Sequence, residues 1–254
     1  FIVCSKRKVA VNYAGVIKME KAELIRQTER IASGIEGLDG LLQGGFIKGD
    51  TILMAGNTGS GKTIFSAQFI HNGAAIYGER GVYATFEEDA NTLKRNMLGF
   101  GFDLEKLEQK GEIRVMDLEA IKGSGVSANI EFILSAIREL EAKRLVVDSL
   151  TAFLSACEER FQYRMLMHLF YKILKKLGCT TIMTCSIPTG SNVLGLGIEE
   201  FVADSVITLE SFIHDGELKT RFLVRKMRGT HHSKKYHEVI ISGKGLKIVP
   251  FSMT

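Results

Sequence analysis

The sequence predicts an α/β fold: a mainly parallel central sheet flanked by helices, with a C-terminal antiparallel β-hairpin extension. Short runs rich in β-branched residues alternate with longer segments of helical periodicity, which is the pattern of βαβ units. After about residue 204 the pattern changes to strands joined by tight turns, as in antiparallel hairpins. Both observations predict one sheet with the hairpins at one of its edges.

Six short apolar runs are the expected strands of the main sheet. They cover residues 51–55, 82–86, 113–117, 145–148, 180–185 and 204–209. Four segments between them carry apolar residues at helical spacing, so we expect helices at 62–77, 89–100, 127–142 and 160–177. The two expected hairpin turns are His214-Asp215-Gly216 and Gly243-Lys244-Gly245.

The composition indicates one main domain. The 254 residues are 45% hydrophobic and 24% charged, enough for one α/β core, and no Pro-rich or Gly/Ser-rich stretch suggests a linker. We expect a domain at 29–254 and a peripheral N-terminal extension at 1–28, in which an amphipathic segment begins at Met19. Four cysteines without C-x-x-C spacing, and no apolar run of ~20 residues, favour a cytoplasmic protein without a membrane span.

The strongest motif is a glycine-rich loop after the first strand of this sheet. Its sequence, GNTGSGKT, fits G-x-x-x-x-G-K-[ST], the phosphate-binding loop (P-loop). Its glycines let several backbone N–H groups point at one anion, and the helix that follows adds its positive end. We expect Lys62 to reach the terminal phosphates of a nucleotide and the Thr63 hydroxyl to bind Mg²⁺. The loop consists of Gly56, Asn57, Thr58, Gly59, Ser60, Gly61, Lys62 and Thr63.

Carboxylates follow two other strands. Ligands of such sheets bind outside the carboxyl ends of the strands, so we expect Asp148 to hold Mg²⁺ and Ser149 to lie beside the nucleotide. The alternative for Asp148 is an acid that caps the next turn. One of Glu87 and Glu88 would orient or deprotonate the attacking water while the other supports the metal or the loop. Alternatively, both only place negative charge, with Asp89, at the start of the next helix.

Over roughly residues 30–250 the chain resembles the single-domain KaiC-type ATPases of the RecA superfamily. The resemblance rests on the order and spacing of RIASGIEGLDGLLQGGFIKGD, GNTGSGKT, TFEED, RNMLGFGFDLEKL, RLVVDSLTAF, GIEEFVADSV and KMRGTHH. It implies a RecA-like core, ATP with Mg²⁺, and usually a hexameric ring whose nucleotides lie between subunits.

The same resemblance implies that Glu87 and Glu88 are catalytic. It also implies that a segment K-x-R-G-T-x-H, here called the trans segment, contacts the phosphates of a nucleotide held by the neighbouring subunit. An arginine there would donate charge-assisted hydrogen bonds to the γ-phosphate. The alternative is an exposed basic turn between strands. The four positions of the trans segment are Lys226, Arg228, Thr230 and His232.

One segment departs from the two-domain clock proteins of this family, whose second domain phosphorylates an adjacent Ser/Thr pair. Aligned on Asp204, those positions are Glu200 and Phe201 in this chain, and neither side chain has a hydroxyl. The chain therefore resembles the ATPase half of such proteins, and we do not expect autokinase activity.

We expect a regulatory ATPase that binds ATP and ADP, forms a homo-hexamer and changes its affinity for an unknown protein partner with its nucleotide state. A DNA-repair ATPase related to RecA is one alternative. The loop 186–198, which would face the DNA, has no Lys, Arg or aromatic residue, and the net charge is only +4, so nucleic acid is not the expected partner. A nucleotide-sensing scaffold with little turnover is the other alternative, and the intact Glu87-Glu88 pair argues against it.

Overall fold

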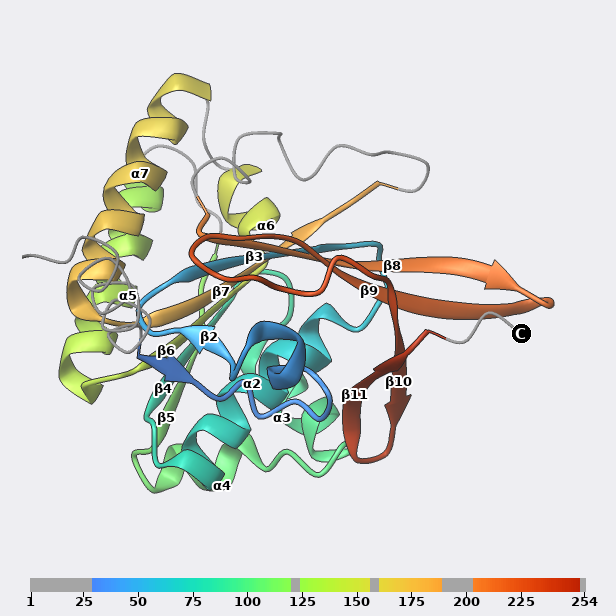
Figure 1. Ribbon diagram of the computed structural model, residues 1–254. Coiled ribbons are helices and arrows are strands. Elements are labelled where there is room, and N and C mark those ends of the chain that lie inside the picture. Colours follow the sequence, from blue (N-terminus) through green and yellow to red (C-terminus); the bar gives the residue numbers. More distant parts are fainter. Residues whose placement is uncertain (1–28, 120–123, 156–159, 189–202, 252–254) are drawn as a thin grey trace, which may run out of the picture.

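The computed structural model describes residues 29–119, 124–155, 160–188 and 203–251 (Figure 1). The expected N-terminal extension at 1–28 lies outside these residues, as do most of the loop 186–198 and the positions Glu200 and Phe201. No helix in the described ranges is both long and apolar enough to cross a bilayer.

A nine-stranded sheet forms the centre of the chain, in the order β11-β10-β9-β8-β3-β7-β6-β4-β5 (Figure 1). Its parallel part confirms the six predicted strands. They are β3 (Thr51–Gly56), β4 (Gly81–Thr85), β5 (Ile113–Asp117), β6 (Arg144–Asp148), β7 (Thr180–Ser186) and β8 (Ser205–His214).

Three antiparallel strands extend the sheet beyond β8, as the sequence predicts. They are β9 (Glu217–Met227), β10 (His237–Ser242) and β11 (Gly245–Pro250). Both predicted turns join hairpins: Asp215 and Gly216 lie between β8 and β9, and Gly243 and Lys244 lie between β10 and β11. A separate two-stranded sheet is formed by β1 (Arg30–Ile31) and β2 (Phe46–Ile47).

The four predicted helices are present with small shifts at their ends. They are α2 (Lys62–Tyr77), α3 (Ala90–Leu98), α5 (Ser124–Leu140) and α7 (Arg160–Leu177). Three shorter helices were not predicted: α4 (Leu104–Gln109), α6 (Leu150–Ser155) and the 3-10 helix η1 (Asp39–Leu42). Elements of four to six residues are too short to show helical periodicity, although Asp103 caps α4 by accepting a hydrogen bond from Lys106 N.

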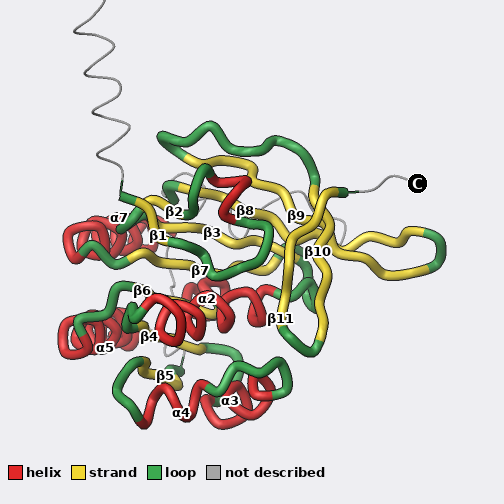
Figure 2. Tube along the Cα trace, turned by 60° about the horizontal axis from the view of Figure 1, so that its bottom comes forward, coloured by secondary structure: helices red, strands yellow, loops and turns green. Residues whose placement is uncertain are grey.

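The helices cover both faces of the sheet (Figure 2). Helices α5, α6 and α7 pack on one face, whereas α2, α3, α4 and the N-terminal segment from β1 to β2 pack on the other. Strand β3 shows the result, because Leu53 and Ala55 face the first layer, Ile52 and Met54 face the second, and all four are fully buried. Covering on both faces explains why these strands are continuous apolar runs in the sequence.

The strand register brings the carboxyl ends of four strands to one edge of the sheet. Gly56 of β3 lies opposite Ser186 of β7, and Thr85 of β4 lies opposite Asp148 of β6. The loops after these strands therefore open on the same side. Strand β9 runs the other way, so its last residue, Met227, lies at the opposite, amino edge.

Candidate functional site

The P-loop joins β3 to α2 and is held in place by Asn57. The Asn57 side-chain amide donates to the Ile187 carbonyl at 3.3 Å, and its oxygen accepts from Ser211 N at 3.0 Å. Gly59 and Gly61 have φ of 78° and 92°, which favour glycine, and a Cβ on Gly59 would meet nothing within 4 Å. The loop is thus curled, pinned at its start and open at Gly59, where a phosphate group would approach the backbone.

Lys62 crosses the inside of this loop. Its Nζ donates to the carbonyls of Gly56 and Asn57, both at 2.9 Å. Burial lowers the pKa of Lys62, and the negative charges of Asp148 and Glu87 oppose that shift. The ammonium group therefore lies in the field of two carboxylates that the sequence analysis assigns to the site. The half-buried Thr63 follows it in the first turn of α2.

Asp148 ends β6 in a buried position, 8% exposed. One carboxylate oxygen accepts from the Tyr83 hydroxyl at 2.6 Å, and the other accepts from Thr184 Oγ1 at 2.5 Å. Burial raises the pKa of Tyr83 well above its usual value, so its hydroxyl stays protonated and donates. Each oxygen keeps a lone pair for a further ligand. The helix cap expected as an alternative role of Asp148 is instead supplied by Ser149, whose Oγ accepts from Ala152 N at 3.1 Å.

The two adjacent glutamates after β4 point to different places. Glu87 accepts a hydrogen bond from Ser149 Oγ, next to Asp148. Glu88 turns toward α3 and accepts from Asn96 Nδ2 at 2.6 Å. Asp89 caps α3 by accepting from Thr92 N at 2.9 Å. Of the two glutamates, Glu87 is therefore the one that lies with Lys62 and Asp148 in the site.

The trans segment lies far from this site. The backbone N–H of Arg228 donates to the Asp204 carbonyl, so Arg228 lies beside Asp204. Leu209, which lies opposite Gly56 of the P-loop, is five residues further along the chain, or roughly 16 Å along the strand. Thr230 Oγ1 accepts from Arg30 Nη2 at 2.8 Å, and the ring Nδ1 of His232 contacts the Ser233 carbonyl at 2.9 Å, also away from the P-loop. The structure therefore brings together the P-loop, Glu87, Asp148 and Ser149, but not the four trans-segment residues.

A magnesium site here would depend on the nucleotide. In the described part of the chain, no three His, Cys, Asp or Glu side chains come together as ligands for a metal ion. The hydroxyl of Thr63 and the carboxylate of Asp148 are oxygen donors of the kind that Mg²⁺ prefers, and phosphate oxygens and water would complete its shell. The donor set at the P-loop fits Mg²⁺ bound with a nucleotide.

Two site residues were not predicted. Tyr83 and Thr184 orient Asp148 from the two strands that flank β6. A hydroxyl residue near the carboxyl end of a buried strand, such as Thr184 in TTIMTCS, is the signal that would have indicated such a partner.

The protein family described as "ATPase: KaiC" matches residues 31–252, which include the whole site. The chain belongs to the KaiC ATPase family. Its P-loop and RecA-like fold agree with the resemblance noted from the sequence motifs, and the TFEED segment carries Glu87.

Several relatives are similar to this KaiC-family chain. The Circadian clock oscillator protein KaiC of Synechococcus elongatus is 36% identical over 225 residues, which are 85% of this chain but 43% of the relative. The UPF0273 protein PH0284 of Pyrococcus horikoshii is 35% identical over 238 residues, which are 88% of this chain and 95% of the relative. The chain thus spans less than half of the clock protein and nearly all of the archaeal one.

A solved structure shares the fold. The crystal structure of the KaiC-like protein PH0186 from Pyrococcus horikoshii matches with a TM-score of 0.80 and 41% identity, over 88% of this chain and 100% of that one. The single-domain KaiC-like proteins are therefore similar to this chain over most of their length.

Proposed function

We propose that this KaiC-family chain binds ATP with Mg²⁺ and hydrolyses it to ADP and phosphate. The observation that carries the proposal is the meeting of Lys62, Glu87 and Asp148 at one edge of the sheet, beside the open backbone of the P-loop. Phosphoryl transfer depends mainly on positioning and on neutralising charge, and these groups supply both.

Each residue has a distinct role in this proposal. The backbone N–H groups of the P-loop and the start of α2 bind the phosphates, and Lys62 exchanges its two carbonyl partners for phosphate oxygens. When bound through Thr63 and Asp148, Mg²⁺ would neutralise charge on the transferred phosphoryl group. Glu87 orients the attacking water and accepts its proton, while Ser149 holds the Glu87 carboxylate in position. Glu88 supports the loop through α3.

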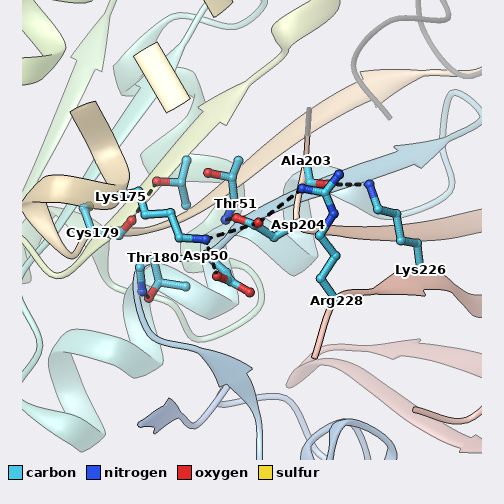
Figure 3. Close-up of polar contacts among 11 residues, drawn as sticks. Asp50, Thr51, Lys175, Cys179, Thr180, Ala203, Asp204, Lys226 and Arg228 are labelled. Carbon is cyan, nitrogen blue, oxygen red and sulfur yellow. Dashed lines mark hydrogen bonds and ion pairs between the residues drawn. The ribbon is translucent and has the colours of Figure 1, made fainter. Parts of the chain in front are cut away.

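The site is completed by a neighbouring copy in this proposal. Lys226 and Arg228 lie toward the amino edge, away from the P-loop of their own subunit: Lys226 Nζ donates to the Ala203 carbonyl, and Arg228 Nη1 lies 3.8 Å from Asp204 Oδ1 (Figure 3). The same placement exposes Arg228 at the amino edge, with 56% of its side chain accessible. A ring in which this edge meets the next P-loop would give every nucleotide a trans contact. Sedimentation with and without ATP tests it, and a monomer under both conditions would contradict it.

Release of inorganic phosphate from ATP by the purified protein tests the hydrolysis itself. We expect turnover that requires Mg²⁺ and falls to background in the Glu87→Gln/Glu88→Gln double variant. Glu131→Gln, which changes an exposed carboxylate on α5, is the matched control and should keep the wild-type rate. Turnover of the wild type no faster than that of the double variant would defeat the enzyme proposal.

We further propose that nucleotide state controls binding to a protein partner. Affinity capture from the native host in the presence of ATP or ADP tests this role. A partner held in one nucleotide state and released in the other is expected. Equal capture in both states would contradict the regulatory part while leaving hydrolysis untouched.

A further inference from the structure

The β10–β11 hairpin packs against the last glycine of the P-loop. A Cβ on Gly61 would lie 2.9 Å from Ile241 Cδ1 and 3.6 Å from Leu246 Cδ1. Gly61 has a left-handed φ of 92° and is the N-cap of α2, so it forms the turn from which the first N–H groups of that helix emerge. Two apolar side chains of the hairpin therefore support the part of the loop that would present these N–H groups to a phosphate.

The β10–β11 hairpin lies beside α2 (Figure 2), and Gln68 of α2 joins the two. The Gln68 side-chain amide donates to the Leu246 carbonyl at 3.1 Å, and its oxygen accepts from Leu246 N at 2.8 Å. The packing around this pair is close, because a Cβ on Gly245 would lie 2.6 Å from Gln68 Oε1. The hairpin is therefore bound to the same helix whose first turn it supports.

The β8–β9 hairpin contacts the other end of the loop. Ser211 N, in β8, donates to Asn57 Oδ1 at 3.0 Å. Gly56 also lies close against β8, because a Cβ there would be 2.5 Å from the Leu209 carbonyl oxygen. By contrast, a Cβ on Gly59, between these two ends, would meet nothing within 4 Å. The two C-terminal hairpins thus contact the P-loop at both ends and leave its middle open.

We propose that Ile241 is a positioning residue that holds the P-loop in its nucleotide-binding shape. This inference rests on the proposed function, because it presumes that the P-loop binds a nucleotide. A glycine-rich loop without support has many alternative conformations, and ordering it costs conformational entropy. A side chain that orders the loop before the nucleotide arrives removes part of this cost from the binding step, which increases the affinity.

The neighbouring residue Ile240 allows this role to be separated from ordinary packing. Ile240 and Ile241 are adjacent in β10, and both side chains are 38% exposed. Successive side chains of a strand point to opposite faces, so Ile240 points away from the P-loop. A loss of packing on β10 alone should affect both positions alike, whereas a role in positioning the P-loop should affect only Ile241.

Equilibrium binding of a fluorescent ADP analogue to the purified protein tests the inference. We expect Ile241→Ala to weaken binding about 3- to 10-fold, and Ile241→Val, which deletes only Cδ1, to weaken it less. In ATP turnover, KM should rise by a similar factor while kcat stays near the wild-type value, because the loop binds the ground state and the transition state alike. Ile240→Ala is the matched control and should bind as tightly as wild type.

The possible outcomes are distinguishable. Equal nucleotide affinities of Ile241→Ala and Ile240→Ala would overturn the inference, as would a fall in kcat without a change in KM. If urea unfolding shows that Ile241→Ala is not folded, Ile241→Val decides: weaker binding than wild type supports the inference, and unchanged binding contradicts it. Nucleotide binding without hydrolysis would overturn only the proposed enzyme activity and leave this test intact, whereas no binding by the wild type would overturn both.

Discussion

Asp50 is a buried carboxylate whose ionisation should destabilise the fold. Its side chain is 7% exposed, and it lies beside Asp204 with Lys175 Nζ at 3.3 Å (Figure 3). Burial, and then repulsion from Asp204, raise the pKa of Asp50 from 3.8 to about 6, although Lys175 and Arg30 act in the opposite direction. The perturbation we consider is Asp50→Asn, which removes this ionisation and keeps an oxygen for Lys175.

The raised pKa sets the size and sign of the effect. One pKa unit corresponds to ~1.4 kcal/mol, so a shift from 3.8 to about 6 corresponds to about 3 kcal/mol. Because the folded carboxyl group holds its proton more tightly than the unfolded one, its contribution to stability is fully present below pH 3.8. That contribution is lost as the pH rises to about 6. Asp50→Asn should therefore be up to about 3 kcal/mol more stable than wild type at pH 7.5, and nearly equal to it at pH 4.

Urea unfolding of both proteins at the two pH values measures this difference. The comparison between wild type and variant cancels the carboxylates that do not interact with Asp50, because they titrate alike in both proteins. Glu131→Gln, which removes the charge of an exposed carboxylate on α5, serves as the control and should show no pH-dependent difference. The reasoning is refuted if the free-energy difference for Asp50→Asn is the same at both pH values, or if the variant is less stable at pH 7.5.

Three further predictions concern single positions. Glu87→Gln should lower kcat for ATP by ~10²–10⁴-fold. Glu88→Gln should lower kcat clearly less, because the Glu88 carboxylate faces α3. Equal losses of phosphate release in the two variants would contradict the division of roles. Gly37→Ala should destabilise the fold by more than ~3 kcal/mol in urea unfolding, because φ is 82° and the new Cβ would lie 1.9 Å from a carbonyl oxygen of β11. Gly40→Ala is the control: its new Cβ has no atom within 4 Å, so this variant should unfold near the wild-type midpoint. Arg144→Ala should cost about 3–5 kcal/mol in urea unfolding, since this fully buried guanidinium pairs with a glutamate and two backbone carbonyls; a loss below ~1 kcal/mol would show that these contacts contribute little.

The sheet could be predicted because its strands are buried on both faces. A run such as Thr51-Ile52-Leu53-Met54-Ala55 has no polar face, which is the pattern of a strand covered by helices on both sides. The meeting of strand ends at one edge was also expected, since ligands of such sheets bind outside the carboxyl ends of the strands, and Gly56 of β3 and Ser186 of β7 lie opposite each other there. The strands could therefore be predicted from local sequence wherever both of their faces are buried.

The partners of the site residues could not be predicted in the same way. Tyr83 and Thr184 bond to Asp148 from strands that are distant in sequence, and which hydroxyl faces which carboxylate depends on strand order as well as on local composition. The sequence predicted that Glu87 and Glu88 would have different roles, because neighbouring side chains diverge, but not which of them would face the P-loop. The direction follows from the positions of Ser149 and Asn96.

Strand β3 connects two parts of the proposed interface. One is the P-loop, which the neighbouring subunit would contact, and the other is the amino edge, from which the trans segment would contact the next subunit. It is buried throughout and pairs with β7 and β8 along its length, with the P-loop at one end and the hydrogen bond from Thr51 N to Asp204 Oδ2 at the other. In a cell that makes two versions of the protein, damage at Lys62 should silence only the subunit that carries it and behave as a recessive defect. Damage at Arg228 should pass to the next subunit. A cavity in β3 should weaken both the subunit's own site and its contribution to the next one.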